Sequence, residues 1–211
     1  MGTYYRERAE QYDSLYSAPE RQRDLASLKR WVAHHTVRRS VLEIAAGTGF
    51  WTQAAAARAT AITATDLNTA TLTIAAKRRL GPHVTLLEAD AYALPKFACR
   101  FETGMAHLWW SHVDLQRARR FLLHFASRLQ PGGELLMIDQ LYLEGYSTPA
   151  FRRDRAGNRY ELRTLENGHV FQIVKNYPTR AELQAIVGDV CKEVRITCLT
   201  YFWALRARVR G

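Results

Sequence analysis

The sequence predicts an α/β domain built on a mainly parallel sheet, and three observations support that class. Short apolar runs alternate with helical patterns from about residue 40 onward, which is typical of successive βαβ units. Residues 41–52 form an apolar strand pattern that turns through glycines into a helix pattern. Residues 134–141 are almost continuously apolar, as expected of a strand covered on both faces. With 211 residues, 47% of them hydrophobic, the chain can form one core, so we expect a single domain over residues 1–211.

The individual strands and helices can be assigned in order along the chain. Strands are expected at 40–45, 61–65, 84–88, 101–108, 134–141, 192–198 and 201–209. Helices are expected at 4–16, at 21–34, from 51 through the alanine run, from 68 to before Gly81, from 114 to about 129, and from 179 to about 188. Asn68 and Asp114 are predicted N-caps, and Thr179 with Glu182 forms a capping box. Pro131-Gly132-Gly133 is expected to end the helix that Asp114 begins.

The alternation of strands and helices stops after residue 141. Runs at 158–165 and 170–175 flank Asn167-Gly168, a dipeptide that favours a tight hairpin turn. We therefore expect a β-hairpin insertion within residues 142–177, near one end of the sheet.

Composition narrows the expected location and partners. No apolar stretch approaches the roughly 20 residues that a membrane span requires, and Met1–Glu10 is charged where a secretory signal is apolar. We therefore expect a cytoplasmic protein without membrane association. Cys99, Cys191 and Cys198 show no metal-ligand spacing, so no metal is expected. The net charge of +10 leaves a nucleic-acid partner open without identifying one, and both a monomer and a homodimer are compatible with the sequence.

The turn that contains Gly47 and Gly49 is the most informative segment. Glycines at the carboxyl end of a strand let backbone amides approach a bound cofactor closely. A dinucleotide would place its pyrophosphate at this turn, where Glu43 would repel it, and Thr52 occupies the position of the third glycine of dinucleotide sites. S-Adenosylmethionine instead brings an ammonium and a sulfonium group, which a nearby carboxylate favours. These features favour S-adenosylmethionine as the cofactor.

Two further acids follow the next predicted strands. Asp66 ends the second strand and Asp90 ends the third, so both are expected at the sheet edge that carries the glycine turn. A carboxylate at Asp66 suits the ribose hydroxyls, and one at Asp90 suits the adenine amino group.

The segment Leu42-Glu43-Ile44-Ala45-Ala46-Gly47-Thr48-Gly49, together with Asp66, Asp90 and Leu129-Gln130-Pro131-Gly132-Gly133, resembles the class I S-adenosylmethionine-dependent methyltransferases of the small bacterial type. The resemblance covers most of the chain and implies a Rossmann-like sheet of seven strands, the last one antiparallel, with helices on both faces. One departure is Ala45, because the family often has glycine at that position. A β-carbon at Ala45 restricts the backbone beside the ligand.

The resemblance also implies contacts for the cofactor. The glycine motif would hold its methionine portion, Asp66 its ribose and Asp90 its adenine. Residues 1–36 would form a lid on the cofactor, and the N-terminal helix with Tyr5 and Tyr12 would be part of that lid. The full set of expected cofactor contacts is Tyr5, Tyr12, Glu43, Ala45, Gly47, Thr48, Gly49, Trp51, Thr52, Asp66, Leu67, Asp90, Ala91 and His107.

Residues for the methyl acceptor are expected after the fourth strand and in the insertion. His112 matches the second histidine of a Leu-His-His-Val stretch in related methyltransferases and is a candidate general base, the alternative being a structural hydrogen-bonding role. Residues 142–177 form the candidate acceptor cap. Expected acceptor contacts are Trp109, Trp110, Tyr142, Tyr146 and Arg152, although core packing or a solvated surface is the alternative for each.

Three functions remain open at this point. The first is transfer of a methyl group to an oxygen or nitrogen nucleophile of a small aromatic or heterocyclic molecule. The second is methylation of RNA or protein, motivated by the net charge of +10. The third is a module that binds the cofactor without transferring the methyl group.

Overall fold

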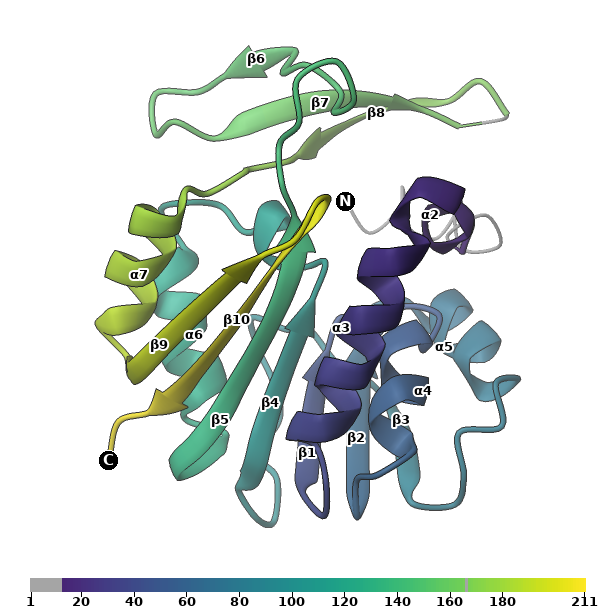
Figure 1. The fold of residues 1–211 in the computed structure, drawn as a ribbon, viewed down its shortest axis with the longest axis vertical. Helices are drawn as coiled ribbons and strands as arrows, with labels where there is room; N and C mark the ends of the chain where they lie inside the picture. Colours follow the sequence, from purple (N-terminus) through teal and green to yellow (C-terminus); the bar gives the residue numbers. More distant parts are fainter. Residues whose placement is uncertain (1–12, 166) are drawn as a thin grey trace.

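The computed structural model describes residues 13–165 and 167–211, and its main feature is a seven-stranded sheet in the order β3-β2-β1-β4-β5-β10-β9 (Figure 1). The strands are β1 Ser40–Ile44, β2 Ala61–Asp66, β3 Val84–Glu88, β4 Phe101–His107, β5 Leu129–Gln140, β9 Cys191–Cys198 and β10 Phe202–Val209. Strands β1 to β5 pair in parallel, whereas β10 is inserted antiparallel between β5 and β9. This topology confirms the predicted seven-stranded sheet with an antiparallel last strand.

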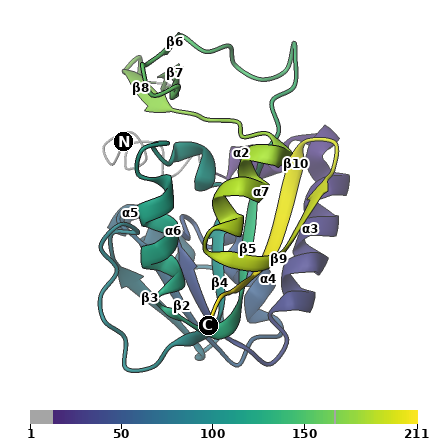
Figure 2. The ribbon, with the colours of Figure 1, turned by 90° about the vertical axis from the view of Figure 1, so that its left-hand side faces the viewer.

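Helices cover both faces of this sheet (Figure 2). They are α2 Ser14–Ser17, α3 Gln22–His35, α4 Phe50–Ala56, α5 Thr69–Ala76, α6 Ala118–Ala126 and α7 Arg180–Gly188, with short 3-10 helices η2 at Pro19–Arg21 and η3 at Trp110–His112. Leu42 and Ile44 of β1 pack with α6 and α7, while Val41 packs with α3 and α4. The alternation of side chains along β1 therefore joins two apolar layers across one sheet.

Two predicted helix starts are confirmed and one predicted helix is wrong at both ends. The Asn68 side chain accepts the Ala70 backbone N–H, and Thr179 and Glu182 form the expected capping box. The predicted helix from Asp114 begins only at Ala118, because the Asp114 carboxylate holds the Gln116 backbone N–H at 2.8 Å in a separate turn.

The same helix ends at Ala126, and the following residues belong to β5. Leu129 pairs with Phe101 of β4, and the register then shifts before Thr103 pairs with Glu134. Pro131-Gly132-Gly133 lies in this irregular start of β5 and does not end the helix. Strand pairing with β4 therefore overrides the helical spacing of Leu129. Most of the helix expected at 4–16 lies outside the described residues.

The insertion forms a second, three-stranded antiparallel sheet beyond the carboxyl ends of the parallel strands (Figure 1). Its strands are β6 Arg152–Arg153, β7 Arg159–Thr164 and β8 Val170–Val174. The hairpin of β7 and β8 agrees with the prediction. Strand β6 has only two residues, which is too short to leave a pattern in the sequence. Within the described part of the chain, no helix is long and apolar enough to cross a membrane.

Candidate active site

The turn after β1 brings the backbone back along the sheet edge. Ala45, Gly47 and Gly49 all have left-handed backbone conformations, with φ of 49°, 57° and 78°. A β-carbon at Gly49 would lie 3.0 Å from the Ala75 β-carbon of α5, so glycine is also required there for close packing. Ala45 adopts the left-handed region despite its β-carbon, at a cost of roughly 1 kcal/mol. The turn is therefore compatible with alanine at position 45.

A cavity of about 410 Å³ opens at this turn, at the carboxyl edge of the parallel strands. Six expected cofactor contacts line it, namely Ala45, Gly47, Asp66, Leu67, Asp90 and Ala91. The strand ends of β1, β2 and β3 thus contribute side by side to one cavity, which we call the first cavity.

The two strand-end carboxylates are held by the backbone. Asp66 accepts the N–H groups of Gly47 and Asn68, both at 2.8 Å, so its carboxylate fastens the glycine turn to the end of β2. Asp90 accepts the Tyr92 N–H at 2.8 Å. Burial raises the pKa of Asp66 in spite of these bonds. Both acids are therefore oriented before any ligand binds, and each carboxylate oxygen retains acceptor capacity.

Glu43 does not line the first cavity, in contrast to the expectation. Its side chain lies under α4, where Thr52 Oγ1 donates to Glu43 Oε2 at 2.6 Å. Burial raises the pKa of Glu43 to about 8. The acid is thus largely neutral at pH 7 and does not provide the negative charge that the sequence argument assigned to it. Thr52 likewise serves the packing of α4.

His107 and Trp51 also pack in the interior and do not line the cavity. Their rings meet edge to face with centroids 5.3 Å apart. Neither ring nitrogen of His107 has a partner of good hydrogen-bond geometry among the described residues, and burial lowers its pKa to about 3. His107 is therefore a neutral core residue at the end of β4.

Thr48 and Gly49 do not line the first cavity. Thr48 instead contacts the segment before α2. The Thr48 hydroxyl donates to Asp13, and Arg78 binds both Asp13 and the Thr48 carbonyl oxygen. These contacts connect the segment before α2 to the glycine turn. The other expected contacts, Tyr5 and Tyr12, lie outside the described residues.

The first cavity has walls that the sequence analysis missed. The Arg117 guanidinium stacks 3.8 Å from the centre of the Tyr92 ring, and both residues line the cavity. Arg117 had the pattern of a solvated helix-face arginine, so nothing in the sequence distinguished it. The remaining additional lining residues are Asn68, Thr71, Ala89, Leu108, His112, Asp114 and Val174.

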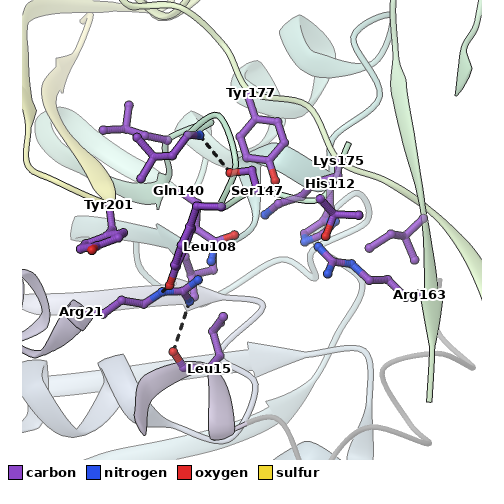
Figure 3. A pocket seen from close by; sticks show the side chains of 15 residues that line it. Leu15, Arg21, Leu108, His112, Gln140, Ser147, Arg163, Lys175, Tyr177 and Tyr201 are labelled. Carbon is purple, nitrogen blue, oxygen red and sulfur yellow. Dashed lines mark hydrogen bonds between the residues drawn. The ribbon is translucent and has the colours of Figure 1, made fainter. Parts of the chain in front are cut away.

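A second, smaller cavity of about 130 Å³ lies against the first and shares Leu108 and His112 with it (Figure 3). Leu108 follows β4 with φ of 53°, and this left-handed residue turns the chain into the 3-10 helix that carries His112. The second cavity is lined by Leu15, Arg21, Leu108, His112, Gln140, Leu141, Leu143, Tyr146, Ser147, Thr148, Arg163, Ile173, Lys175, Tyr177 and Tyr201. These residues come from the N-terminal segment, the end of β5, the inserted sheet and the β9–β10 turn.

His112 is fixed to the inserted sheet. Its Nδ1 lies 2.7 Å from the carbonyl oxygen of Val174, so this nitrogen carries the proton and donates. Burial, reinforced by the nearby Lys175, lowers the pKa of His112 to about 3. The imidazole is neutral at pH 7 and is a weak base.

Two cations that line the second cavity, Lys175 and Arg163, form ion pairs with buried carboxylates. Lys175 Nζ donates to Ser111 Oγ at 2.8 Å and lies 3.6 Å from Asp139 Oδ1. Arg163 binds Glu161, whose other oxygen accepts the Tyr177 hydroxyl at 3.1 Å. Both carboxylates are fully buried.

The expected acceptor contacts separate into two groups. Tyr146 lines the second cavity and Trp109 lines the first. Trp110 packs in the core near Phe121, Tyr142 packs against Tyr177, and Arg152 stacks on Tyr160 at the surface. These last three residues line neither cavity.

The first cavity fits an adenosyl cofactor. Its volume lies within the range of about 300–1,000 Å³ of small-ligand sites. Asp66 and Asp90 present acceptors at neighbouring strand ends, and apolar Leu67 and Ala91 provide walls for a flat ring. Among the described residues there is no group of three His, Cys, Asp or Glu side chains that could hold a metal ion.

Comparison with known proteins agrees with this geometry. Residues 41–133 match a family model described as a methyltransferase domain. A search of curated proteins found no significant match. The matched segment contains the glycine turn, Asp66, Asp90 and the shared residues of the two cavities. Residues 41–133 therefore form a methyltransferase domain, and the fold of the chain is that of the class I S-adenosylmethionine-dependent methyltransferases.

Similar solved structures cover nearly the whole chain. A complex of DhpI with SAM and HEP is 25% identical over 98% of this chain and 94% of that chain, with a TM-score of 0.80. The glycopeptide N-methyltransferase MtfA, with S-adenosylhomocysteine, is 20% identical over 87% and 89%, with a TM-score of 0.66. CalS10, an amino pentose methyltransferase from Micromonospora echinaspora, is 19% identical over 92% and 96%, with a TM-score of 0.63.

Proposed function

We propose that this methyltransferase acts on an oxygen or nitrogen nucleophile of a small molecule bound in the second cavity. The observation that carries the proposal is that the two cavities meet at Leu108 and His112. S-Adenosylmethionine supplies an electrophilic methyl group when it is bound in the first cavity. An acceptor in the second cavity would approach that group across the shared residues, which is the alignment that a direct displacement requires.

The size and position of the second cavity favour a small acceptor. Its volume of about 130 Å³ and its cover by the inserted sheet suit a compact molecule better than a strand of RNA or a protein surface. Tyr146, Tyr177 and Tyr201 provide rings against which an aromatic or heterocyclic acceptor would pack. We therefore retain an aromatic or heterocyclic molecule as the proposed acceptor, and residues 142–177 as its cap.

In this proposal His112 positions the acceptor and is not a strong base. A neutral imidazole held by Val174 presents one fixed face to both cavities, but a pKa of about 3 provides little driving force for removing a proton. The displacement itself requires no base when the nucleophile is already unprotonated. Asp66 and Asp90 hold the cofactor, and the N-terminal residues 1–36 form part of its lid.

Calorimetric titration with S-adenosylhomocysteine, alongside NADH, tests the cofactor site. We expect micromolar binding of S-adenosylhomocysteine and none of NADH. Asp66→Ala should weaken binding by about tenfold or more, because it removes a charged acceptor at the ribose position. Asp189→Ala is the matched control, since this exposed acid pairs with Arg119 at 3.7 Å and lines neither cavity.

A methyl-transfer panel then tests the acceptor class. Small phenols, amines and nitrogen heterocycles are compared with total RNA and with mixed proteins, using release of S-adenosylhomocysteine as the readout. Turnover of at least one small nucleophile is expected. Turnover of RNA or protein alone would overturn the proposal, and cofactor binding without any turnover would support a binding module instead.

A further inference from the structure

The second cavity has a cationic lining. Arg21, Arg163 and Lys175 all line it, and none of the Asp and Glu residues in the described part of the chain does. Figure 3 shows Arg21 entering from the side of the N-terminal segment and Arg163 and Lys175 from the side of the inserted sheet. A ligand in this cavity would therefore meet positive groups from two sides.

The counter-charges of two of these cations lie behind the cavity wall. Asp139 and Glu161 are both 0% exposed and line neither cavity. Asp139 lies 3.6 Å from Lys175 Nζ, and Glu161 binds Arg163. The carboxylates thus hold the two cations in place at the wall of the second cavity. Solvated surface charges would not need buried partners of this kind.

Arg21 is held by neutral groups on its own side. Its Nε donates to the Tyr146 hydroxyl at 2.8 Å, and its Nη1 donates weakly to the Leu15 carbonyl at 3.4 Å. The acid nearest to it in the network is the exposed Glu20, which accepts the Tyr146 hydroxyl at 2.6 Å and does not line the cavity. The guanidinium is therefore oriented by hydrogen bonds and retains donors for a further acceptor.

Neutral donors complete the same wall. Tyr177, Tyr201, Gln140 and Ser147 line the cavity with the three cations. Charged donors bind an oxyanion with short hydrogen bonds that are about twice as strong as neutral ones, and an arginine fork suits the two oxygens of a carboxylate or phosphoryl group. Buried carboxylates pair with Arg163 and Lys175, but no Asp or Glu of the described residues lines the cavity beside them, so a bound oxyanion would meet donors and no negative side chain.

We propose that the second cavity selects a small organic oxyanion as the methyl acceptor, with Arg21, Arg163 and Lys175 binding its carboxylate or phosphoryl group. This inference rests on the proposed function, because it assigns the substrate class of the same site. The relevant chemistry is a compact acid that places an oxygen or nitrogen nucleophile toward Leu108 and His112. Its anionic group lies against the cations of the N-terminal segment and the inserted sheet.

Binding to the protein loaded with S-adenosylhomocysteine provides the test. Benzoate, inorganic phosphate and the neutral benzamide are titrated by calorimetry. We expect at least one of the two anions, benzoate or phosphate, to bind. If benzoate binds, benzamide should bind at least tenfold more weakly than benzoate. Preference for benzoate would indicate a carboxylate acceptor, and preference for phosphate a phosphoryl acceptor.

Variants locate the binding site. Arg21→Gln, Lys175→Met, and Arg163→Gln combined with Glu161→Gln should each weaken anion binding by tenfold or more. The double variant removes both partners of a buried pair, so no uncompensated charge remains. Arg21→Gln changes a partly exposed side chain without a buried counter-ion, which keeps one variant free of folding effects. Arg152→Gln is the matched control on the inserted sheet and should leave anion binding unchanged within twofold.

Two outcomes would overturn the inference. One is binding of neither anion to a protein that binds S-adenosylhomocysteine normally, and the other is anion binding that Arg21→Gln and the double variant leave unchanged. If the wild-type protein does not bind S-adenosylhomocysteine, this result would instead contradict the cofactor site and hence the proposed function. Methyl transfer to neutral phenols or amines but not to their matched acids would contradict the acidic acceptor while supporting the methyltransferase.

Discussion

The Nδ1 atom of His112 lies 2.7 Å from the carbonyl oxygen of Val174, and this single bond connects the segment after β4 to the last residue of β8. Two neighbouring hydrogen bonds connect the same two segments. Asn176 N–H donates to the Ser111 carbonyl at 2.7 Å, and Lys175 Nζ donates to Ser111 Oγ at 2.8 Å. The inserted sheet is thus fastened directly to the residues that border both cavities.

Replacing His112 distinguishes positioning from base catalysis. His112→Asn retains a donor for the Val174 carbonyl and should lower kcat by about tenfold, whereas loss of a true general base costs about 10²–10⁴-fold. Because burial lowers the pKa of His112 to about 3, the wild-type kcat/KM should show no His112 titration between pH 5.5 and 8. A thousandfold loss of kcat, or the disappearance of a titration near pH 6.5 in the variant, would assign a base role to His112.

Glu43→Gln should leave the affinity for S-adenosylhomocysteine unchanged within twofold, because Glu43 lies outside the first cavity. The substitution should affect stability instead. The folded carboxyl keeps its proton up to a pKa of about 8, whereas the unfolded one releases it near 4.5. The contribution of Glu43 to stability is therefore present below pH 4.5 and is lost as the pH rises through 8.

Urea unfolding at pH 6, 7 and 8 measures this difference. The free energy of unfolding of Glu43→Gln relative to wild type should rise by about 1.4 kcal/mol per pH unit over this range. The Thr52 hydroxyl retains an acceptor in the variant. Tenfold weaker binding of S-adenosylhomocysteine would show that Glu43 acts on the cofactor after all.

His107 should make the protein sensitive to acid. Its folded pKa of about 3 lies below the unfolded value of 6.5, so below pH 6.5 the unfolded chain binds a proton that the folded chain does not. Its stabilising contribution is lost as the pH falls below 6.5. His107→Leu should remove about 1.4 kcal/mol of this loss per pH unit, measured as unfolding free energies at pH 7, 6 and 5. Parallel pH curves for variant and wild type would contradict the neutral buried histidine.

Gly49→Ala should destabilise the protein by about 2 kcal/mol, from left-handed strain and from the contact with Ala75 at 3.0 Å. Gly168→Ala provides the matched control. Gly168 has a similar φ of 81°, but an added β-carbon would meet no atom within 4 Å, so only the strain of about 1 kcal/mol remains. Equal losses for the two variants, measured by thermal unfolding, would show that packing at Gly49 contributes nothing.

The parts of the fold that were predicted correctly depend on neighbours in the chain. Strand alternation, the Asn68 cap and the Thr179–Glu182 box are set by residues a few positions apart. The failure around Leu129 has the opposite origin. Its pairing with Phe101 of β4 is a contact between segments that local spacing does not encode.

By itself the sequence determined the parallel sheet, the glycine turn and the two carboxylates at the strand ends. Parallel strands bring their carboxyl ends to one edge, so Asp66 and Asp90 had to approach Gly47. Only the tertiary structure decided that Glu43 lies under α4 as a largely neutral acid. It also decided the second cavity, whose cations come from Arg21 near one end of the chain and from Arg163 and Lys175 in the insertion. In a linear sequence these cations have the pattern of solvated charges. Only the tertiary structure pairs two of them with the buried Asp139 and Glu161 at the wall of one cavity.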